Sequence, residues 1–303
     1  MRFVRSRRSL HRWLAVLFAL GAVGACREHA GSAPSKTDIV DDYGRVVRLE
    51  TPPRRIVSLN PATTELLFAL GAGPRVVGRT RYDFWPDSAT LVPSVGAGMR
   101  PNLEAVLGRQ PDLVVMYASG DDRAAADRLT ASGVATAAFR IDKISDFRRV
   151  TLQLGRLVGD TVRARNVVDS VTATLDRVRH ATAALARPAV FLHAWEKPLM
   201  TIGGGSFLSE LVTIAGGRNI YDSLPAPSPV VTLEDVLRRN PDIVLVSPVE
   251  REQLLRSARW QALPAVGANR VVSYDTNLVE RPSVKLGEAA VSLARLLHPG
   301  LVP

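Results

Sequence analysis

The sequence predicts an α/β protein with two similar lobes joined by one long rigid helix. A fourteen-residue stretch occurs twice, as Leu103–Met116 and Leu233–Val246, with eight identical positions at a constant offset of 130. Strand-like and helix-like segments alternate in both halves of the chain, which is typical of parallel sheets covered by helices. Between the halves, residues 145–186 contain no proline, as a long helix requires.

Each copy of the repeat predicts a short helix followed by a buried strand. The helix begins after a good N-cap, Asn102 or Thr232, and ends before Pro111 or Pro241, because proline disfavours helical backbone in the residue before it. The β-branched apolar run that follows suits a buried parallel strand. One copy cannot bury itself and two copies are too few for a solenoid, so we expect two Rossmann-like lobes.

The repeat places a glutamate at equivalent positions of the two lobes. Glu104 and Glu234 both fall in the first turn of the repeated helix, where a negative charge complements the helix dipole. That stabilising role is expected of both residues and does not exclude a second one.

The first lobe contains the remaining elements in a regular order. A hairpin that turns near Gly44 is followed by alternating strands and helices. These are the strand 55–59, a helix from Asn60 to Gly71 with Pro61 at its first position, the strand 76–78, the first repeat, a helix over 121–131 and the strand 134–139.

A loop rich in aromatic residues follows the strand 76–78. Tyr82, Phe84 and Trp85 lie within four residues in a chain that is only 6% aromatic. Loops at the carboxyl ends of strands bind ligands in open α/β sheets. Either these aromatics contact a ligand, or they pin the loop to the core.

The second half repeats the alternation after the connecting helices. We expect one helix up to Val158 and a long helix from Thr161. They are followed by the strand 189–193, a glycine turn at 203–205 opening the helix 207–215, the second repeat, the strand 270–274 and an amphipathic helix ending at Leu297. No Walker lysine or serine follows the glycines in register, so a tight turn is favoured over a phosphate cradle.

The N-terminus has the features of an exported protein. Residues 1–25 combine five arginines with an apolar run and a small-residue cleavage site, and the run is too short for a membrane span. Cys26 is the only cysteine and follows Val-Gly-Ala, which resembles a bacterial lipobox and predicts lipidation at Cys26. A plain signal peptide is the alternative, and Ser6-Arg7-Arg8 leaves twin-arginine export open. The predicted organisation is signal peptide 1–25, lipidated tether 26–37, N-terminal lobe 38–158, connecting helix 159–187 and C-terminal lobe 188–303.

Charge and residue types exclude several functions. The formal charge of +10 falls to about +5 without the signal segment, which leaves 34 basic against 29 acidic residues and gives no nucleic-acid signature. The five histidines show no metal-ligand spacing, and neither a Gly-x-Ser-x-Gly elbow nor a Cys–His pair occurs. We therefore expect a binding protein, with no catalytic residue and no metal ligated by the protein. The histidines are His11, His29, His180, His193 and His298.

From Asp38 to Leu297 the chain resembles the periplasmic binding proteins for cobalamin, iron-siderophores and haem that serve ABC importers. The resemblance is carried by 55–65, by Asn102-Leu103-Glu104 with Pro111-Asp112, by 198–207, by 215–220 and by Leu233-Glu234. The stretch 195–220 is most similar to the cobalamin-binding branch.

The resemblance implies a monomer with a shallow cleft for an intact metal chelate, with cobalamin favoured, and no covalently bound cofactor. It implies that Glu104 and Glu234 dock on arginines of the ABC importer permease. Charge-assisted pairs at two separated points would fix the docking orientation. The lipobox-like sequence separately predicts that a lipid on Cys26 holds the protein at the membrane.

The resemblance also suggests ligand-binding residues. Tyr82, Trp85, Asn277 and Arg281 are carried over by position, and Phe84 and Trp195 are added from their places in the chain. Flat aromatics suit the apolar face of a corrin, and polar side chains suit its amide edges. The chain departs from the cobalamin binders where Gly98 and Ser228 fall about where those proteins have tryptophans.

Two other functions stay open at this point. Arg79, Arg81 and Arg281 would favour an anionic iron-siderophore or haem if they line the cleft. A third reading is an exported chelatase that inserts or removes a metal, with His193 as its base.

Overall fold

The computed structural model describes residues 37–301, which belong to one compact unit. The predicted signal peptide, Cys26 and most of the predicted tether lie outside the described residues. Thr37, assigned to the tether, is instead the first residue of strand β1 (Thr37–Val40). No helix in the described part is long and apolar enough to cross a membrane.

The N-terminal lobe (residues 37–158) is built on a parallel sheet with strand order β4-β3-β5-β6. β1 pairs with β2 (Val46–Leu49) as the predicted antiparallel hairpin. The sheet strands are β3 (Ile56–Ser58), β4 (Val76–Gly78), β5 (Leu113–Tyr117) and β6 (Ala135–Phe139). The helices are α1 (Pro61–Ala69), α2 (Asp87–Thr90), α3 (Leu103–Leu107), α4 (Arg123–Ala131) and α5 (Ile144–Val158), with a 3₁₀ turn at Gly73–Arg75.

The C-terminal lobe (residues 183–301) has strand order β11-β10-β7-β8, with β9 also pairing with β7. Its strands are β7 (Ala189–Glu196), β8 (Leu199–Thr201), β9 (Arg218–Asn219), β10 (Ile243–Val246) and β11 (Val271–Ser273). Its helices are α7 (Phe207–Ile214), α8 (Leu233–Arg239), α9 (Pro248–Arg256), α10 (Pro264–Gly267), α11 (Thr276–Val279) and α12 (Leu286–Leu297), with a 3₁₀ turn at Trp260–Ala262. β8, β9, α2, α9, α10 and α11 were not predicted.

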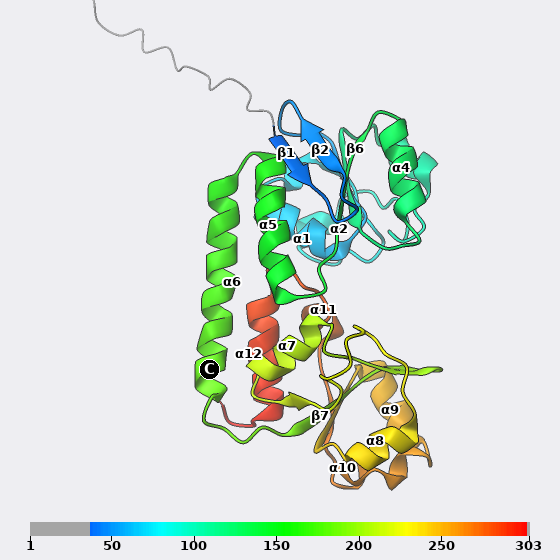
Figure 1. The fold of residues 1–303 in the computed structure, drawn as a ribbon, viewed down its shortest axis with the longest axis vertical. Helices are drawn as coiled ribbons and strands as arrows, with labels where there is room; N and C mark the ends of the chain where they lie inside the picture. Colours follow the sequence, from blue (N-terminus) through cyan, green and yellow to red (C-terminus); the bar gives the residue numbers. More distant parts are fainter. Residues whose placement is uncertain (1–36, 302–303) are drawn as a thin grey trace, which may run out of the picture. The chain divides into compact units, whose positions relative to one another are not determined.

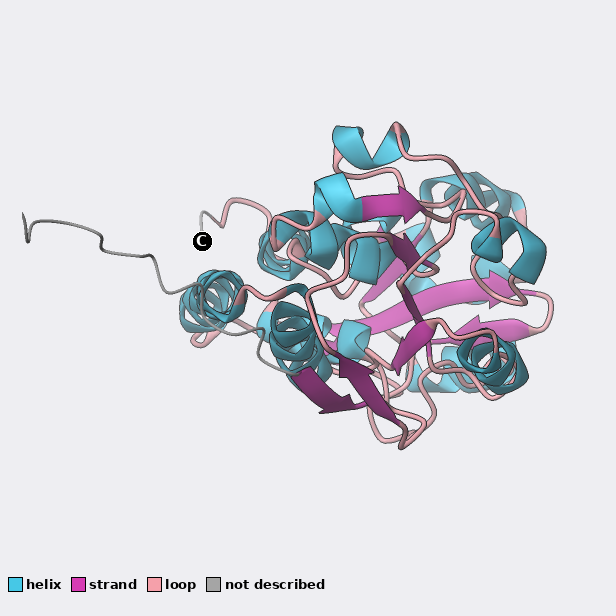
Figure 2. Ribbon diagram, turned by 90° about the horizontal axis from the view of Figure 1, so that it is seen from above, coloured by secondary structure: helices cyan, strands magenta, loops and turns pink. Residues whose placement is uncertain are grey.

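Both sheets are covered on two faces, as a doubly wound fold requires. Alternate residues of β5 enter different apolar clusters: Leu113 and Val115 pack in one, Val114 and Met116 in another. Alternate residues of β10 likewise pack in two different apolar clusters. Figure 2 shows helices on either side of the strands. This double burial explains the continuous apolar runs that the sequence presents as strands.

The predicted long helix is α6 (Thr161–Thr182), which begins at the N-cap Asp160. It buries one stripe, from Ala164 through Val171 to Val178. α5 packs along one half of α6 and α12 along the other (Figure 1). Two glycines allow the close approach: a Cβ on Gly155 would lie 2.3 Å from the Cβ of Ala164, and one on Gly287 2.8 Å from that of Thr174. The lobes are therefore joined by a packed helical layer.

The two copies of the repeat have equivalent structures. Asn102 caps α3 by accepting from the backbone N–H of Ala105, and Thr232 caps α8 by accepting from that of Asp235. Asp112 accepts the backbone N–H groups of Arg54 and Arg55, and Asp242 accepts that of Ala189. Each Pro-Asp pair thus anchors the start of the neighbouring strand.

Candidate functional site

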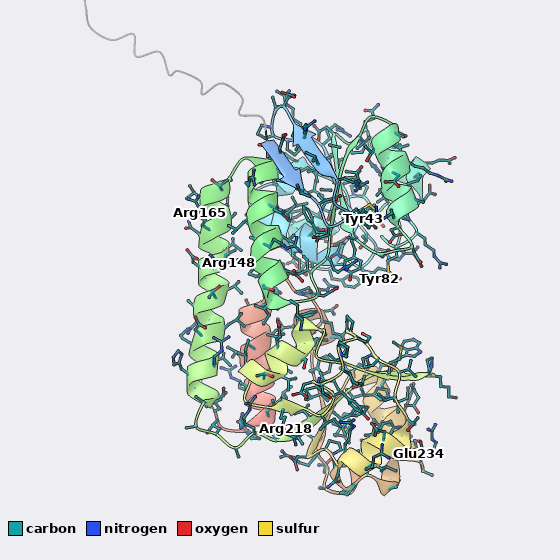
Figure 3. The ribbon with its side chains drawn as sticks, in the orientation of Figure 1. Tyr43, Tyr82, Arg148, Arg165, Arg218 and Glu234 are labelled. Atoms are coloured by element: carbon teal, nitrogen blue, oxygen red, sulfur yellow. The ribbon has the colours of Figure 1, made fainter. Side chains whose placement is uncertain are left out.

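A cleft of about 390 Å³ lies where the two lobes face each other. Its walls come from segments that follow β3, β4, β5, β6 and β11, at the carboxyl ends of the strands, together with the start of α7. The lining residues are Asn60, Pro61, Ala62, Tyr82, Tyr117 and Ile141 from the first lobe, and Phe207, Thr276, Asn277, Glu280, Arg281 and Pro282 from the second. Figure 3 shows Tyr82 on the side of the first lobe that faces the second.

A larger hollow of about 660 Å³ lies elsewhere, beside the edge strand β4 of the first lobe. Its walls include Phe68, Leu91 and Val92. None of the predicted ligand-binding residues lines it, so the inter-lobe cleft is the better candidate for the site.

Arg281 brings three of the predicted ligand-binding residues together. Its guanidinium donates to the backbone carbonyl of Tyr82 at 2.8 Å and to Oδ1 of Asn277 at 3.2 Å. It also lies 5.5 Å from the ring centroid of Phe84, within cation–π range. Phe84 itself does not line the cleft. Arg281 therefore holds the aromatic loop against the second lobe.

The counter-ion of Arg281 is Glu65, which sequence reasoning treated only as part of helix α1. The Nη1 and Oε1 atoms lie 3.1 Å apart, and the Glu65 side chain is 1% exposed. Ser283 also donates its hydroxyl to Glu65. Burial raises the pKa of the Glu65 carboxyl, while the hydrogen bonds from Ser283 and Arg281 act in the opposite direction. A buried ion pair thus crosses from one lobe to the other behind the cleft.

The aromatic loop is anchored by Asp83 and not by its aromatic side chains. Asp83 is buried and accepts the backbone N–H of Thr80 at 2.5 Å. Burial raises the pKa of its carboxyl. Tyr82 and Phe84, on either side, are about half exposed. The Lys285 ammonium lies 4.3 Å from the ring centroid of Trp85, and Trp85 does not line the cleft.

The structure does not bring Trp195 into the cleft. Its indole N–H donates to the backbone carbonyl of Lys197 at 3.0 Å, and its side chain is 57% exposed. This hydrogen bond holds the ring at the β7–β8 hairpin, where the strand register shifts between His193 and Trp195. A ligand role for Trp195 stays a prediction from its position in the chain.

The periplasmic binding protein family model matches residues 56–278. The chain belongs to this family. This periplasmic binding protein is 30% identical over 246 residues to the vitamin B12-binding protein of Salmonella typhimurium, covering 80% of this chain and 90% of that one. The crystal structure of the periplasmic vitamin B12-binding protein BtuF of Vibrio cholerae superposes with a TM-score of 0.72 at 24% identity, covering 81% and 97% of the two chains. The periplasmic heme-binding protein RhuT from Roseiflexus sp. RS-1 superposes with a TM-score of 0.73 at 23% identity, covering 81% and 98%.

These matches confirm the two-lobed fold and the binding-protein class. Periplasmic binding proteins deliver ligands to ABC importers and are not enzymes. The exported chelatase reading is therefore wrong. His193 is a buried residue outside the cleft, with Nε2 at 2.9 Å from Glu196 and Nδ1 at 3.4 Å from Glu250. In the part of the chain that the structure describes, no three His, Cys, Asp or Glu side chains converge on a metal position.

The two repeat glutamates of this binding protein lie on exposed helix ends, away from the cleft. Glu104 and Glu234 are both exposed in the first turns of α3 and α8. α3 packs against α4, and both α4 and α8 lie on the side of the fold away from α6 (Figure 1). Figure 3 shows Glu234 at the outer surface of α8.

The side chain of Asp235, next to Glu234, makes hydrogen bonds and ion pairs, whereas the side chain of Glu234 does not. Asp235 accepts from Tyr221 and contacts Arg238 and Arg239, and these bonds hold the pKa of Asp235 at about 2. Among the described residues, neither the Glu104 nor the Glu234 carboxylate has a hydrogen bond or ion pair. The repeat thus presents an exposed and unpaired carboxylate at the equivalent position of each lobe.

Proposed function

We propose that this periplasmic binding protein is a lipid-anchored receptor that binds an intact corrinoid, with cobalamin as the favoured ligand, and delivers it to the permease of an ABC importer. The observation that carries the choice of ligand is the charge of the cleft. Among the described residues that line it, Arg281 is the only cation and Glu280 is the only carboxylate, and Glu65 offsets the charge of Arg281 from behind. A corrinoid with amide edges suits a wall that has no net positive charge better than an anionic chelate does.

The lining also matches the two surfaces of a corrinoid. Tyr82, Tyr117 and Phe207 provide aromatic area, and Asn60 and Asn277 provide amide groups. Flat apolar surface with a few placed polar groups is the usual composition of a ligand site. The relatives named vitamin B12-binding proteins support the same ligand.

Two arginines that would favour an anionic chelate, Arg79 and Arg81, do not line the cleft. The Arg79 guanidinium donates to the carbonyls of Thr80 and Thr90, both at 2.7 Å. Arg81 is exposed, 6.0 Å from the ring centroid of Tyr82. Receptors for an anionic iron-siderophore or haem are the second candidate function, and the rim cations Arg81 and Lys285 are what favour them.

Aromatic contact with the ligand is tested by alanine at Tyr82. We expect Tyr82→Ala to weaken cyanocobalamin binding by about 1–3 kcal/mol, the range for removing one stacked ring, because Tyr82 lines the cleft. Isothermal titration of the purified variant measures the change. A dissociation constant equal to that of the wild type would remove Tyr82 from the site.

Trp85→Ala makes a matched comparison, because the sequence predicts ligand contact and the structure places Lys285 over the ring. An effect as large as that of Tyr82→Ala supports the predicted contact, with Lys285 displaced by the ligand. An unchanged dissociation constant assigns Trp85 to the packing of its own loop.

For docking, we propose that Glu104 and Glu234 are the two contacts with the permease. Their support is their equivalence in the repeat and their lack of partners within the described residues. Membrane attachment through Cys26 rests on the sequence alone.

A further inference from the structure

The ion pair behind the cleft has features that a fold-stabilising pair does not require. Its carboxylate, on Glu65, is 1% exposed, while its guanidinium, on Arg281, reaches the cleft wall with 13% exposure. A ligand therefore meets the cation and not the anion. The apparent charge of the wall depends on a residue that the ligand does not touch.

Glu65 is held in place from both lobes. It belongs to α1 of the first lobe, whereas Ser283 and Arg281, which donate to it, belong to the second. Arg281 has two further acceptors, the carbonyl of Tyr82 and the amide of Asn277, and both are uncharged. Within residues 37–301, Glu65 is thus the only carboxylate that contacts the guanidinium.

The remaining charge in the lining does not replace Glu65. Glu280 lines the cleft, accepts the Tyr274 hydroxyl at 2.8 Å and forms no ion pair with Arg281. Without Glu65, only the attraction of Glu280, which makes no contact with the guanidinium, would offset the charge that Arg281 presents to the ligand. In a site of low effective dielectric, such a charge favours anions over neutral molecules.

We propose that Glu65 determines the charge class of the ligand: by neutralising Arg281 from behind, it adapts the cleft to an uncharged chelate. This rests on the proposed function as a corrinoid receptor. Glu65 acts through Arg281, so it is a positioning and specificity residue with no ligand contact of its own.

The test compares two probes, neutral cyanocobalamin and anionic hemin, on the purified full-length protein. Glu65→Gln keeps the size of the side chain and removes the charge. Its single amide oxygen can accept from Arg281, and its N–H group can donate to the Ser283 hydroxyl. We expect the ratio of hemin affinity to cyanocobalamin affinity to rise about tenfold or more, and the rise to shrink at high salt. A merely structural pair would lower both affinities together and leave their ratio unchanged.

Glu210→Gln is the matched control. Glu210 also bridges the lobes, accepting the backbone N–H of Ile144 at 2.8 Å with Lys143 at 3.6 Å, but does not line the cleft. Its affinity ratio is expected to equal that of the wild type. An equal shift in Glu210→Gln and Glu65→Gln would overturn the inference.

The double variant Glu65→Gln, Arg281→Gln keeps the test decisive if the single variant does not fold, because it leaves no buried charge unpaired. The ratio of hemin affinity to cyanocobalamin affinity in this double variant is expected to stay at or below the wild-type ratio. A ratio above that of the wild type would overturn the inference. A wild-type protein that binds hemin but not cyanocobalamin contradicts the proposed function alone. The role of Glu65 is then judged by hemin affinity, which must tighten in Glu65→Gln.

Discussion

Replacing both Glu104 and Glu234 with alanine is expected to abolish ligand uptake by cells while leaving ligand affinity near that of the wild type. The two carboxylates are exposed, unpaired within the described residues and equivalent in the two lobes. Charge-assisted contacts at two separated points set both the encounter rate and the orientation of docking. Loss of both removes the orientation, so the effect exceeds that of either single variant.

The control removes the same charge elsewhere. Asp169 on α6 and Glu252 on α9 are exposed carboxylates, and the double variant Asp169→Ala, Glu252→Ala is expected to support normal uptake. Uptake is measured with labelled ligand, and affinity by titration of the purified variants. Normal uptake by the Glu104, Glu234 variant contradicts the docking role. A collapse of its affinity assigns the glutamates to the cleft or the fold.

Arg281→Ala is expected to lower the free energy of unfolding by about 3–5 kcal/mol, the usual cost of leaving a buried partner unpaired, and to weaken ligand binding. Its guanidinium joins Glu65, Tyr82 and Asn277, so both the cross-lobe pair and the cleft wall are lost. Urea unfolding measures the change in stability. Loss of less than about 1 kcal/mol, the value of an exposed pair, would show that the pair does not hold the lobes.

The decrease in the free energy of unfolding of Arg281→Ala is expected to depend on pH, and the direction follows from the pKa of Glu65. Burial already raises the pKa of Glu65, and removal of Arg281 raises it further. A carboxyl with a higher pKa in the folded state than in the unfolded state takes up its proton first in the folded state, so stability rises as pH falls through that range. The deficit of Arg281→Ala should therefore shrink toward acid pH. The double variant Glu65→Gln, Arg281→Ala, which lacks the carboxyl, should not show this shrinkage.

Local signals in the sequence predicted the elements that carry their own start and stop residues. Asn60, Asn102 and Asp160 each cap a helix through the side chain. Ser247 caps α9 and Asp275 caps α11 in the same way, so a start residue alone did not identify these helices. α9 buries only Leu254, so it has no apolar period. β8 and β9 have three and two residues and exist through pairing with β7.

The sequence predicted only part of the site, because local signals do not show which distant residues meet. The strand-end loop predicted Tyr82 near a ligand, but nothing local pairs Glu65 with Arg281, 216 residues later. One signal was available: Glu65 sits among the apolar residues of α1, and a carboxylate in such a place needs a partner. The ligand role of Trp195 was predicted from its position, which does not reveal the hydrogen bond from its indole to the Lys197 carbonyl at the hairpin.

Isothermal titration of the purified full-length protein with cyanocobalamin, with hemin and a ferric siderophore in parallel, tests the central claim most directly. A cleft without net positive charge predicts tight one-to-one binding of cyanocobalamin and weaker binding of hemin and of an anionic ferric chelate. Absence of a cyanocobalamin signal together with tight binding of a ferric chelate or hemin would contradict the corrinoid assignment. The two-lobed fold would stand, and the choice of ligand would pass to the rim cations Arg81 and Lys285.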